Sequence, residues 1–433
     1  MKTRFLSFDG TEQCSSYFEE PDRYSSLFRA LADDRGCAVR GGGLSYCLAS
    51  AADGAKTVST KHFDRILDFD AERRLITVEP GLTVGALNDF VVARGCYFPV
   101  LPGHPSITVG GCAGFNVHGK TQHNIGHFSD HVVALTLFHP DRGEIRCGDG
   151  GDRDLLELTL GGMGLTGCIL NITLRLQPLA SNAVRRTVHR VANLHEAVDV
   201  MRGLDADALY SWNDLNARGD RFGAGIVYEE RFEPGDVAST SRYRTLRARR
   251  RPRPSVWNVA TVHAVNWVYP RRETVRPNRL RSVHDAAFPI NGSEAYFAGF
   301  GARGFREYQM IVAHGAWADA VVDLERVITR SGVPVTLGSL KLFAGSPRLL
   351  WFVDDGVCVT VDVAAGPAAR ALFGALDDLA IDYRAKVNVA KDSRLTAATV
   401  DALFPEYDAF RTRLEAFDPK RRLDTALRRR LDL

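Results

Sequence analysis

The sequence predicts an α+β fold in two domains, on three observations. Its 433 residues exceed what one hydrophobic core usually serves. Short apolar strands alternate with amphipathic helices and glycine-rich turns over about the first 180 residues. An arginine-rich stretch then precedes a second series of regular elements. We expect one domain over residues 1–180, a second over 181–400, and a C-terminal segment over 401–433.

Hydrophobic periodicity places the elements of the first domain. Apolar side chains at helical spacing predict a helix over residues 24–35, which Gly36 ends. The other expected elements are, in order, strands over 37–40 and 75–78, a helix from Thr83 to Gly95, a strand over 132–138, a hairpin turn over 139–145, a helix over 154–160 and a strand over 169–176.

Residues 162–167, Gly-Met-Gly-Leu-Thr-Gly, match the G-x-G-x-x-G dinucleotide fingerprint in the wrong context. That fingerprint needs a strand before it and a helix after it, so that a pyrophosphate meets a helix N-terminus. Here the predicted helix comes first and the alternating strand follows. We therefore interpret these glycines as a tight helix-to-strand turn and reject a Rossmann site.

The second domain begins less regularly. Residues 242–281 hold twelve arginines and a single acidic residue, Glu273, which predicts a mobile loop. Such a loop would attract a phosphate, a nucleotide sugar or an anionic membrane surface, or would serve only as a solubilising insertion. Further on, the expected elements are strands over 305–312, 340–343 and 357–363 and a helix over 316–331.

Two glycine-rich turns carry the clearest functional signal. The first is Arg40-Gly41-Gly42-Gly43-Leu44-Ser45-Tyr46, and the second extends from Pro102-Gly103 through Thr108-Val109-Gly110-Gly111-Cys112 to Asn116-Val117-His118-Gly119. Glycines present backbone N–H groups without a Cβ in the way, which suits a diphosphate. Together the two turns resemble the FAD-binding domain of the vanillyl-alcohol-oxidase family.

That resemblance implies a two-domain flavoprotein of the PCMH type, in which an FAD-binding domain is followed by an antiparallel-sheet substrate domain and by a C-terminal segment that packs back on the FAD domain. The FAD-binding residues that it implies are Arg40, Gly41, Gly42, Gly43, Leu44, Ser45, Tyr46, Pro102, Gly103, Thr108, Gly110, Gly111, Cys112, Asn116, His118, Gly119, Gly167 and Ile169. Many relatives link FAD covalently to a histidine at the position of Leu44, so we expect a noncovalent flavin. Cys47 and Cys112 do not stand where doubly linked relatives have their second anchor.

Further motifs are similar to one branch of this family, the decaprenylphosphoryl-ribose 2-oxidases. These motifs lie at residues 100–103, 108–111, 117–120, 164–167, 304–309, 341–343 and 390–394. In that branch a hydride passes from a furanose carbon to flavin N5, and a partner reductase returns hydride to the other face of the resulting 2-keto sugar. The resemblance implies FAD-dependent oxidation of a secondary alcohol on a sugar or sugar-derived substrate, as half of an epimerisation or as a glycoside-tailoring step. It also implies an NAD(P)H-dependent reductase as a partner.

Matching the motifs residue by residue implies a catalytic set of Lys391, Lys341, His118 and Tyr46. Oxidation of an alcohol requires that the hydroxyl proton be drawn off as hydride leaves, and a desolvated lysine can do this because burial lowers its pKa. Lys391 is the first candidate for polarising the hydroxyl, Lys341 is the second, and His118 is expected to position substrate or flavin. The substrate-binding residues that the resemblance implies are Lys120, Glu307, Gln309, Thr360, Asn388 and Trp212.

Several of these positions depart from the branch. Glu307 stands in place of a glutamine, Asn388 in place of a tyrosine, and Thr360 in place of a cysteine, with Cys358 on the same strand face. The segment around Trp212 also differs from the branch, which has an aromatic contact there. Because the changes cluster on the substrate side, we expect the reaction type to be retained with a different sugar, glycoside or phosphorylated-sugar substrate.

Three other functions fit parts of this pattern. An alditol- or aldonolactone-type oxidase that uses O2 is the main alternative, although such relatives usually carry the covalent histidine. A flavin reductase similar to enolpyruvyl-sugar reductase would need an NADPH site and a proton donor, for which we find no motif. A flavin-binding scaffold or membrane-recruited subunit is disfavoured by the retention of Lys341, Lys391 and His118.

Composition bounds the remaining partners and the location. The net charge of +3 is too small to indicate nucleic-acid binding, and no apolar run is long enough for a signal peptide or a membrane span. Eight scattered cysteines without a Cys-x-x-Cys pair indicate free thiols in a reducing cytoplasm. His118, His123, His127 and His131 lack an accompanying carboxylate motif, so no metal is expected. Membrane association is compatible with the arginine-rich loop but not required by it.

Overall fold

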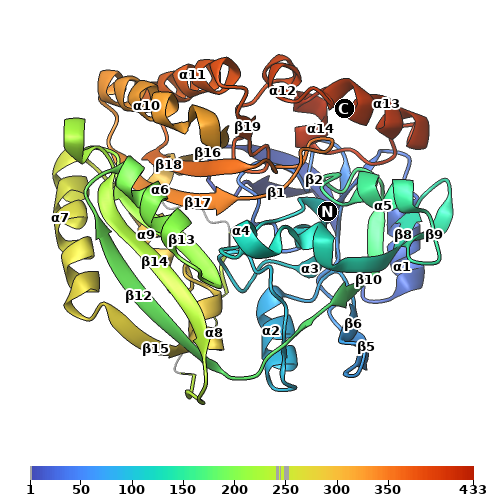
Figure 1. Cartoon of the computed structure of the whole chain (residues 1–433). Coiled ribbons are helices and arrows are strands. Elements are labelled where there is room, and N and C mark those ends of the chain that lie inside the picture. Colours follow the sequence, from blue (N-terminus) through green and yellow to red (C-terminus); the bar gives the residue numbers. More distant parts are fainter. Residues whose placement is uncertain (1, 240–242, 244, 248–252) are drawn as a thin grey trace.

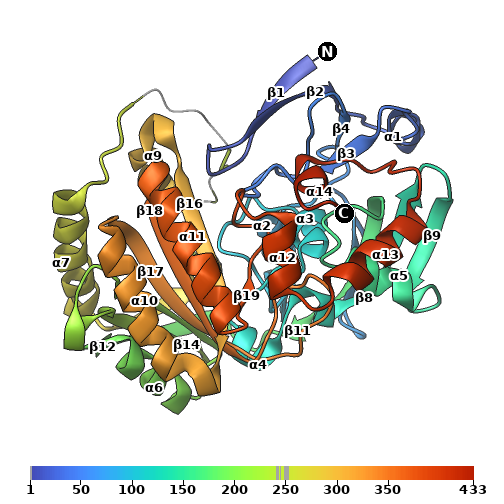
Figure 2. The same ribbon diagram turned by 90° about the horizontal axis from the view of Figure 1, so that it is seen from above.

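The computed structural model describes residues 2–239, 243, 245–247 and 253–433, which form two lobes (Figure 1). The first lobe contains the sheets formed before about residue 180 together with the last helices of the chain (Figure 2). The second lobe is built on one large sheet. This arrangement confirms the predicted α+β class.

Two sheets form the centre of the first lobe. A four-stranded sheet has the order β1-β2-β4-β3 and is parallel except at β1, and a five-stranded antiparallel sheet has the order β5-β6-β10-β8-β9. The strands of this lobe are β1 (Lys2–Leu6), β2 (Gln13–Glu19), β3 (Cys37–Arg40), β4 (Lys56–Ser59), β5 (Ile66–Asp70), β6 (Leu75–Val78), β7 (Cys96–Tyr97), β8 (Val132–His139), β9 (Gly143–Gly148), β10 (Cys168–Arg175) and β11 (Gln177–Pro178). Its helices before the second lobe are α1 (Tyr24–Leu31), α2 (Val84–Val92), α3 (Val109–Gly114), α4 (Gln122–Ile125) and α5 (Arg153–Thr159), with a 3₁₀ turn over Phe128–His131.

The turn at residues 162–167 joins a helix to a strand, as its sequence context predicted. It follows α5 and leads into β10. Gly167 has a φ of +140°, and a Cβ there would lie 2.5 Å from the backbone oxygen of Phe138. This glycine is therefore required by a close approach of two backbones.

The sheet of the second lobe has eight antiparallel strands in the order β15-β12-β14-β13-β17-β18-β16-β19. These strands are β12 (Ala183–Val191), β13 (Ala208–Asp214), β14 (Ala224–Glu233), β15 (Asn278–Ser282), β16 (Phe305–Ala313), β17 (Val335–Phe343), β18 (Gly356–Ala364) and β19 (Lys386–Val387). The helices of this lobe are α6 (Leu194–Gly203), α7 (Val259–Val275), α8 (Val283–Ala287), α9 (Glu294–Gly299), α10 (Trp317–Ser331) and α11 (Pro367–Asp382). Helices α6, α10 and α11 pack on one face of the sheet, over a core that includes Leu340 and Val359. The other face is covered by α7 beside β12 and carries polar side chains on β16, β17 and β18.

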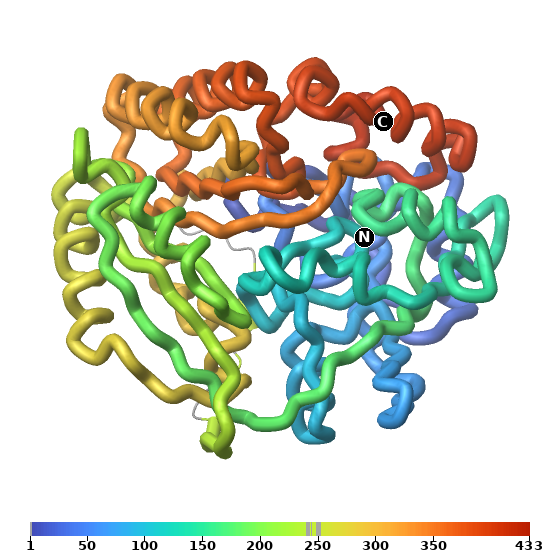
Figure 3. Tube along the Cα trace, viewed as in Figure 1, coloured from blue at the N-terminus to red at the C-terminus, as the bar shows by residue number. Residues whose placement is uncertain are grey.

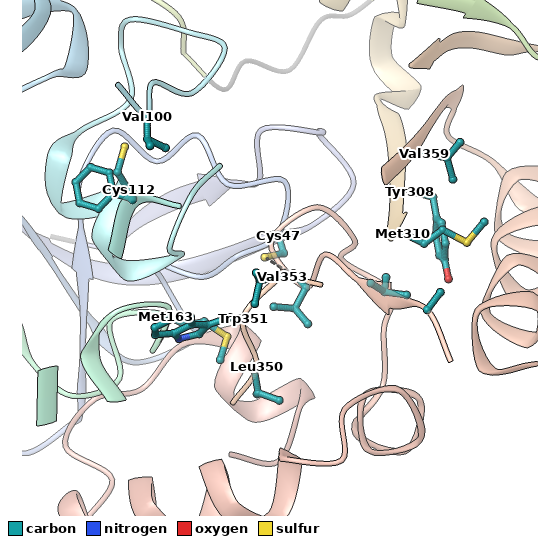
Figure 4. Close-up of a cluster of buried hydrophobic side chains, with 14 of the residues drawn as sticks. Cys47, Val100, Cys112, Met163, Tyr308, Met310, Leu350, Trp351, Val353 and Val359 are labelled. Atoms are coloured by element: carbon teal, nitrogen blue, oxygen red, sulfur yellow. Dashed lines mark hydrogen bonds between the residues drawn. The ribbon is translucent and has the colours of Figure 1, made fainter. Parts of the chain in front are cut away.

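The main hydrophobic core continues from one lobe into the other. Cys47 and Cys112 of the first lobe belong to the same cluster as Tyr308 and Val359 of the second (Figure 4). The segment between β17 and β18 contributes Leu350, Trp351 and Val353 to that cluster. A shared core of this kind holds the two lobes in a fixed relation.

The structure contradicts the loop predicted over residues 242–281. Residues 259–275 form α7, and residues 278–282 form the edge strand β15. Asn258 caps the N-terminus of α7. The inner side of α7 packs on the sheet through Tyr269, whose ring centroid lies 5.3 Å from that of Trp212. Tertiary packing therefore overrides a composition rich in arginine and proline. Residues 242, 244 and 248–252 of the predicted loop lie outside the described residues.

The C-terminal segment packs on the first lobe with α12 (Ala397–Leu403), α13 (Tyr407–Phe417) and α14 (Ala426–Arg430), and Figure 3 shows both chain ends there. Leu423 forms a parallel bridge with Cys37 beside β3, and Arg430 donates a 2.8 Å hydrogen bond to Glu12. Among the residues that the structure describes, no helix is long and apolar enough to cross a membrane.

Candidate active site

The two glycine-rich turns lie against each other in the first lobe. A Cβ on Gly41 would be 2.3 Å from Thr108 Oγ1, and a Cβ on Gly42 would be 3.0 Å from the backbone oxygen of Ser106. Thr108 is held there as the N-cap of α3, where its hydroxyl accepts a hydrogen bond from Gly111 N. Glycine is therefore needed in the first turn so that the second turn can approach it.

The first turn presents a run of unpaired backbone donors. In the described parts of the chain, the N–H groups of Gly42, Gly43, Leu44 and Ser45 donate no hydrogen bond. Gly43 has a φ of +63°, which glycine adopts without strain. Successive free N–H groups in a turn form a concave site for an anion such as a diphosphate.

The second turn ends in two buried polar atoms, Asn116 Nδ2 and His118 Nδ1, that have no hydrogen-bond partner among the described residues. Asn116 has a φ of +42° and is held by a 2.8 Å hydrogen bond from Ser129 N to its Oδ1. Because buried polar groups are normally satisfied, these atoms indicate a polar ligand in this region.

Lys391 stands at the centre of a polar cluster where the two lobes meet. Its Nζ lies 3.7 Å from the ring centroid of Tyr46 and 3.1 Å from Glu307 Oε1. Tyr46 comes from the loop after β3, and its N–H donates to the backbone oxygen of Ala390, next to Lys391. The first glycine turn and the segment after β19 thus position each other.

A chain of buried hydrogen bonds continues across the face of the large sheet that carries Glu307 and Lys341. Asn388 Nδ2 donates to Gln309 Oε1 at 2.8 Å, and Gln309 Nε2 donates to Thr360 Oγ1 at 3.2 Å. Gln309 and Thr360 are direct neighbours on β16 and β18, and Cys358 faces Lys341 on β17 in the same way. The structure therefore gathers these residues on one face beside Lys391.

Burial controls the charges in this cluster. Burial, reinforced by the nearby Lys341, holds the pKa of His118 well below its usual value, so its imidazole is neutral. Burial, reinforced by the charge of Lys391, also lowers the pKa of Lys341. The His118 ring is fixed by edge contacts with Phe343, at a centroid distance of 4.9 Å, and a tilted contact with Phe352.

Two expected substrate residues lie away from this cluster. Lys120 is half-buried, and it donates to Glu230 and to the backbone oxygen of Ala286 beside a separate cavity of about 110 Å³. Trp212 is covered by Tyr269 of α7. A further cavity, of about 590 Å³, is lined by Arg153 and other residues outside the predicted set.

Several expected FAD residues have structural reasons for their identity. A Cβ on Gly110 would meet Pro80 at 2.7 Å, whereas Cys112 and Ile169 belong to the hydrophobic core. Gly103 packs under Ile290, whose N–H donates to the Gly103 oxygen. Gly119 has a similar role, since a Cβ there would lie 3.1 Å from the oxygen of Leu101.

The sequence analysis missed two residues of the site, Asp362 and Tyr296. Asp362 is the only acid within the apolar strand β18, and an acid in such a strand could have indicated a functional residue. It lies on the same face as Thr360. Tyr296 comes from α9 and donates to Asp362 Oδ2 at 2.9 Å. Nothing in the local sequence of Tyr296 indicates this contact.

Comparisons with known proteins agree with this geometry. Residues 20–148 match the model of an FAD binding domain. A decaprenylphosphoryl-beta-D-ribose oxidase of Mycolicibacterium smegmatis is 27% identical over 422 residues, which cover 92% of this chain and 90% of the relative. An uncharacterized protein in the mprA 5′ region of Streptomyces coelicolor is 30% identical over 375 residues, 81% of this chain and 100% of the relative.

Two other similarities extend this result. L-gulonolactone oxidase of Mus musculus is 28% identical over 180 residues, which cover 40% of each chain. The solved structure of a Physcomitrella patens BBE-like 1 variant superposes with a TM-score of 0.64 at 12% identity, and covers 94% of this chain and 89% of that chain. The second similarity shows the shared fold.

Fold and site define an FAD-dependent oxidoreductase. The free N–H groups of the first turn and the orphaned Asn116 and His118 atoms fit the diphosphate and the polar ring edge of FAD. The chain belongs to the vanillyl-alcohol-oxidase-type family of FAD-binding oxidoreductases. The bound FAD supplies a hydride acceptor.

Proposed function

We propose that the protein oxidises a secondary alcohol on a sugar or sugar-derived substrate to a ketone, as half of an epimerisation or as a glycoside-tailoring step. The observation that carries this proposal is the polar cluster of Lys391, Lys341, His118 and Gln309, at the junction of the lobes. Such a cluster suits a hydroxylated substrate, because it offers cationic and neutral groups in one desolvated place. The similarity to a decaprenylphosphoryl-beta-D-ribose oxidase over 92% of the chain supports the same substrate class.

In this proposal Lys391 orients and polarises the substrate hydroxyl. Its side chain is 27% exposed, which leaves its ammonium group accessible, and Glu307 holds it in place. Lys341, whose pKa is lowered, is a second polar contact. His118 is neutral and therefore acts through hydrogen bonds to substrate or flavin rather than as a charge.

We propose that FAD is bound noncovalently. Leu44 cannot form the covalent bond that a histidine forms at this position. The neighbouring Cys47 is buried, and burial raises its pKa to about 12, so it is an unreactive thiol. Burial likewise raises the pKa of Cys112.

Acid precipitation of the purified protein tests the cofactor proposal. Yellow supernatant containing FAD is the expected result, and a yellow pellet would contradict noncovalent binding. Anaerobic bleaching of the flavin is then followed with D-ribose, ribose 1-phosphate, UDP-glucose and a polyprenylphosphoryl ribose. If no compound of this sugar panel bleaches the flavin, the proposed substrate class is wrong.

An aldonolactone-type oxidase remains the alternative, because L-gulonolactone oxidase is similar over 40% of the chain. It predicts rapid reoxidation of the bleached flavin in air with stoichiometric hydrogen peroxide. Slow reoxidation in air that an added electron acceptor accelerates would favour the oxidation half of an epimerisation. In that case the keto product needs an NAD(P)H-dependent reductase as its consumer.

We also propose that the outer surface of α7 associates with anionic lipid. Val259, Trp267, Val268 and Val275 are 57%, 62%, 50% and 77% exposed on a helix whose inner side already packs on the sheet. Arg271 stacks over Trp267 at 4.3 Å, and Arg272 and Arg276 are exposed beside it. Each basic residue near an anionic bilayer contributes about 1 kcal/mol, and an exposed tryptophan suits the interface.

Cosedimentation with phosphatidylglycerol vesicles tests this surface. Trp267→Ser combined with Arg271→Glu should abolish binding, because it removes the largest apolar group and reverses a charge. Val322→Ser, at another exposed valine, on α10, is the control that should bind like the wild type. Equal binding of the double variant would contradict the proposal. The proposal includes a cytoplasmic location. The eight buried free cysteines support it, and so does the anionic lipid of the inner leaflet, to which this surface of α7 would bind.

A further inference from the structure

Two buried carboxyl groups face each other beside Lys391. Glu307 on β16 and Asp362 on β18 are direct cross-strand partners, and they are 6% and 1% exposed. They lie on the same sheet face as the neighbouring pair Gln309 and Thr360. The register of the two strands therefore forces two acids together at the edge of the site.

The hydrogen bonds around these acids are incomplete. Asp362 Oδ2 accepts from Tyr296, but Asp362 Oδ1 has no hydrogen-bond partner within the described residues, and the partner of Glu307 Oε1 is the Lys391 ammonium group. Two adjacent buried carboxylates do not both remain ionised, because their repulsion is not screened there. Burial, reinforced by Glu307, accordingly holds the pKa of Asp362 well above its usual value.

The other titratable groups that face the pair are two lysines and three groups that burial keeps neutral. Those from the packed elements are Lys391, Lys341, Tyr46, Tyr296 and Cys358. Burial raises the pKa of Cys358 to about 12 and holds those of Tyr46 and Tyr296 well above their usual value, so all three are neutral. Lys391 Nζ lies 3.1 Å from Glu307 Oε1 and pairs with that carboxylate, while burial lowers the pKa of Lys341 beside it.

We propose that Glu307 and Asp362 share one proton, and that the Glu307 carboxylate accepts the hydroxyl proton of the substrate. This inference rests on the proposed function. As the carbinol C–H bond breaks, its hydrogen and electron pair pass as hydride to FAD, which is the oxidant. The O–H bond breaks at the same centre, its electron pair forms the C=O bond, and its proton goes to Glu307. Asp362 is a positioning residue that keeps Glu307 ionised and aimed.

Glu307 suits this role better than Lys391. A protonated lysine has no lone pair with which to accept a proton, and Lys391 is ion-paired. A glutamine at position 307 could not accept the proton either, because an amide has no basic lone pair on nitrogen. The Glu307 carboxylate is therefore the group of this cluster that we assign as the acceptor of the hydroxyl proton.

Infrared spectroscopy of the FAD-loaded protein tests the shared proton without any substrate. The carbonyl stretch of a protonated carboxylic acid should be present in the wild type and absent in Asp362→Asn. Spectra are recorded well above pH 6, because Asp9 is another buried acid, with its pKa raised to about 6 by burial. Asp9→Asn is the matched control and should retain the band. Absence of the band from the wild type would overturn the pair.

Stopped-flow flavin reduction tests the proton acceptor, with the compound of the sugar panel that bleaches the flavin fastest. Glu307→Gln should keep the flavin spectrum and slow reduction by about 100-fold or more. Asp362→Asn should slow reduction less than Glu307→Gln does, because an amide still donates to Glu307 and accepts from Tyr296. Wild-type rates in Glu307→Gln would overturn the role of Glu307. If no compound bleaches the flavin, the proposed function fails while the infrared result still decides the pair.

Discussion

Lys391 contacts Tyr46 in the loop after β3 and Glu307 on β16. Its effect on flavin reduction can be measured separately from its effect on flavin binding. We predict that Lys391→Ala leaves the flavin spectrum nearly intact and slows flavin reduction by about 100-fold or more, the usual scale for proton-transfer and polarising groups. Stopped-flow absorbance measures the rate. Lys420→Ala, at a lysine with a 71% exposed side chain, is the control. Unchanged reduction in Lys391→Ala would remove it from the catalytic set.

Gly111 offers a test of the cofactor cradle at the same scale. A Cβ there would meet only Thr108 Oγ1, at 3.1 Å, so the space beyond it is open within the described structure. We predict that Gly111→Val folds but purifies with little FAD, because its side chain would enter that space. Circular dichroism and the ratio of flavin to protein absorbance measure the two effects. Gly315→Val, where no atom lies within 4 Å of the added Cβ, should keep its flavin.

At the scale of elements, the start of α3 joins helix capping to cofactor binding. Thr108 caps the helix and also contacts Gly41. We predict that Thr108→Ala lowers the free energy of unfolding by about 1 kcal/mol and weakens FAD binding, because both turns lose their common contact. Thr396→Ala, which removes the cap of α12, should cost similar stability without changing FAD affinity. Denaturant titration and flavin fluorescence separate the outcomes, and equal FAD affinity in both variants would contradict the link.

The sequence predicted those strands and helices whose own residues show a clear apolar periodicity. The β10, β16 and β18 strands and α10 were found because their apolar periodicity extends over the whole element. Helix α7 was missed because its stability comes from contacts that are distant in sequence, such as the Arg186–Glu273 ion pair. Interior Pro270 also argued against a helix.

The candidate site shows the same division. Its lysines, His118 and the glycine turns were found because their motifs are contiguous. The pairing of Glu307 with Asp362 depends on the register between two strands, 55 positions apart in the sequence numbering (362 − 307), and no single motif contains it. Lys120 is contiguous with His118, yet the chain turns it toward Glu230.

For the whole molecule, the C-terminal segment depends on one buried ion pair. Arg428 and Asp418 are 1% and 0% exposed, and Arg428 Nη1 lies 2.6 Å from Asp418 Oδ2. We predict that Arg428→Met lowers the free energy of unfolding by about 3–5 kcal/mol, because it removes the guanidinium group that balances a buried carboxylate. Adding Asp418→Asn should recover part of the loss. Urea denaturation measures both, and an unaltered midpoint in Arg428→Met would contradict the prediction.

The same pair gives the molecule a defined acid dependence. Burial alone would raise the pKa of Asp418, but His139, Arg428 and two backbone N–H groups hold it below its usual value of 3.8. A carboxyl group whose pKa is depressed by folding contributes stability above its unfolded pKa and loses it as pH falls through its folded pKa. Stability should therefore decline below about pH 4, and less steeply in the Arg428→Met/Asp418→Asn variant. Denaturant titrations across acid pH measure the two slopes.

The bridge between Leu423 and Cys37 has a consequence for how the protein is made. Cys37 leaves the ribosome before Leu423, and the whole eight-stranded sheet is synthesised in between. The sheet edge beside the first glycine turn therefore stays open during translation, whatever the chain has already folded. The parallel bridge to β3 therefore forms only after residue 423 has been synthesised, so the second lobe is available to fold before this edge of the first lobe is complete.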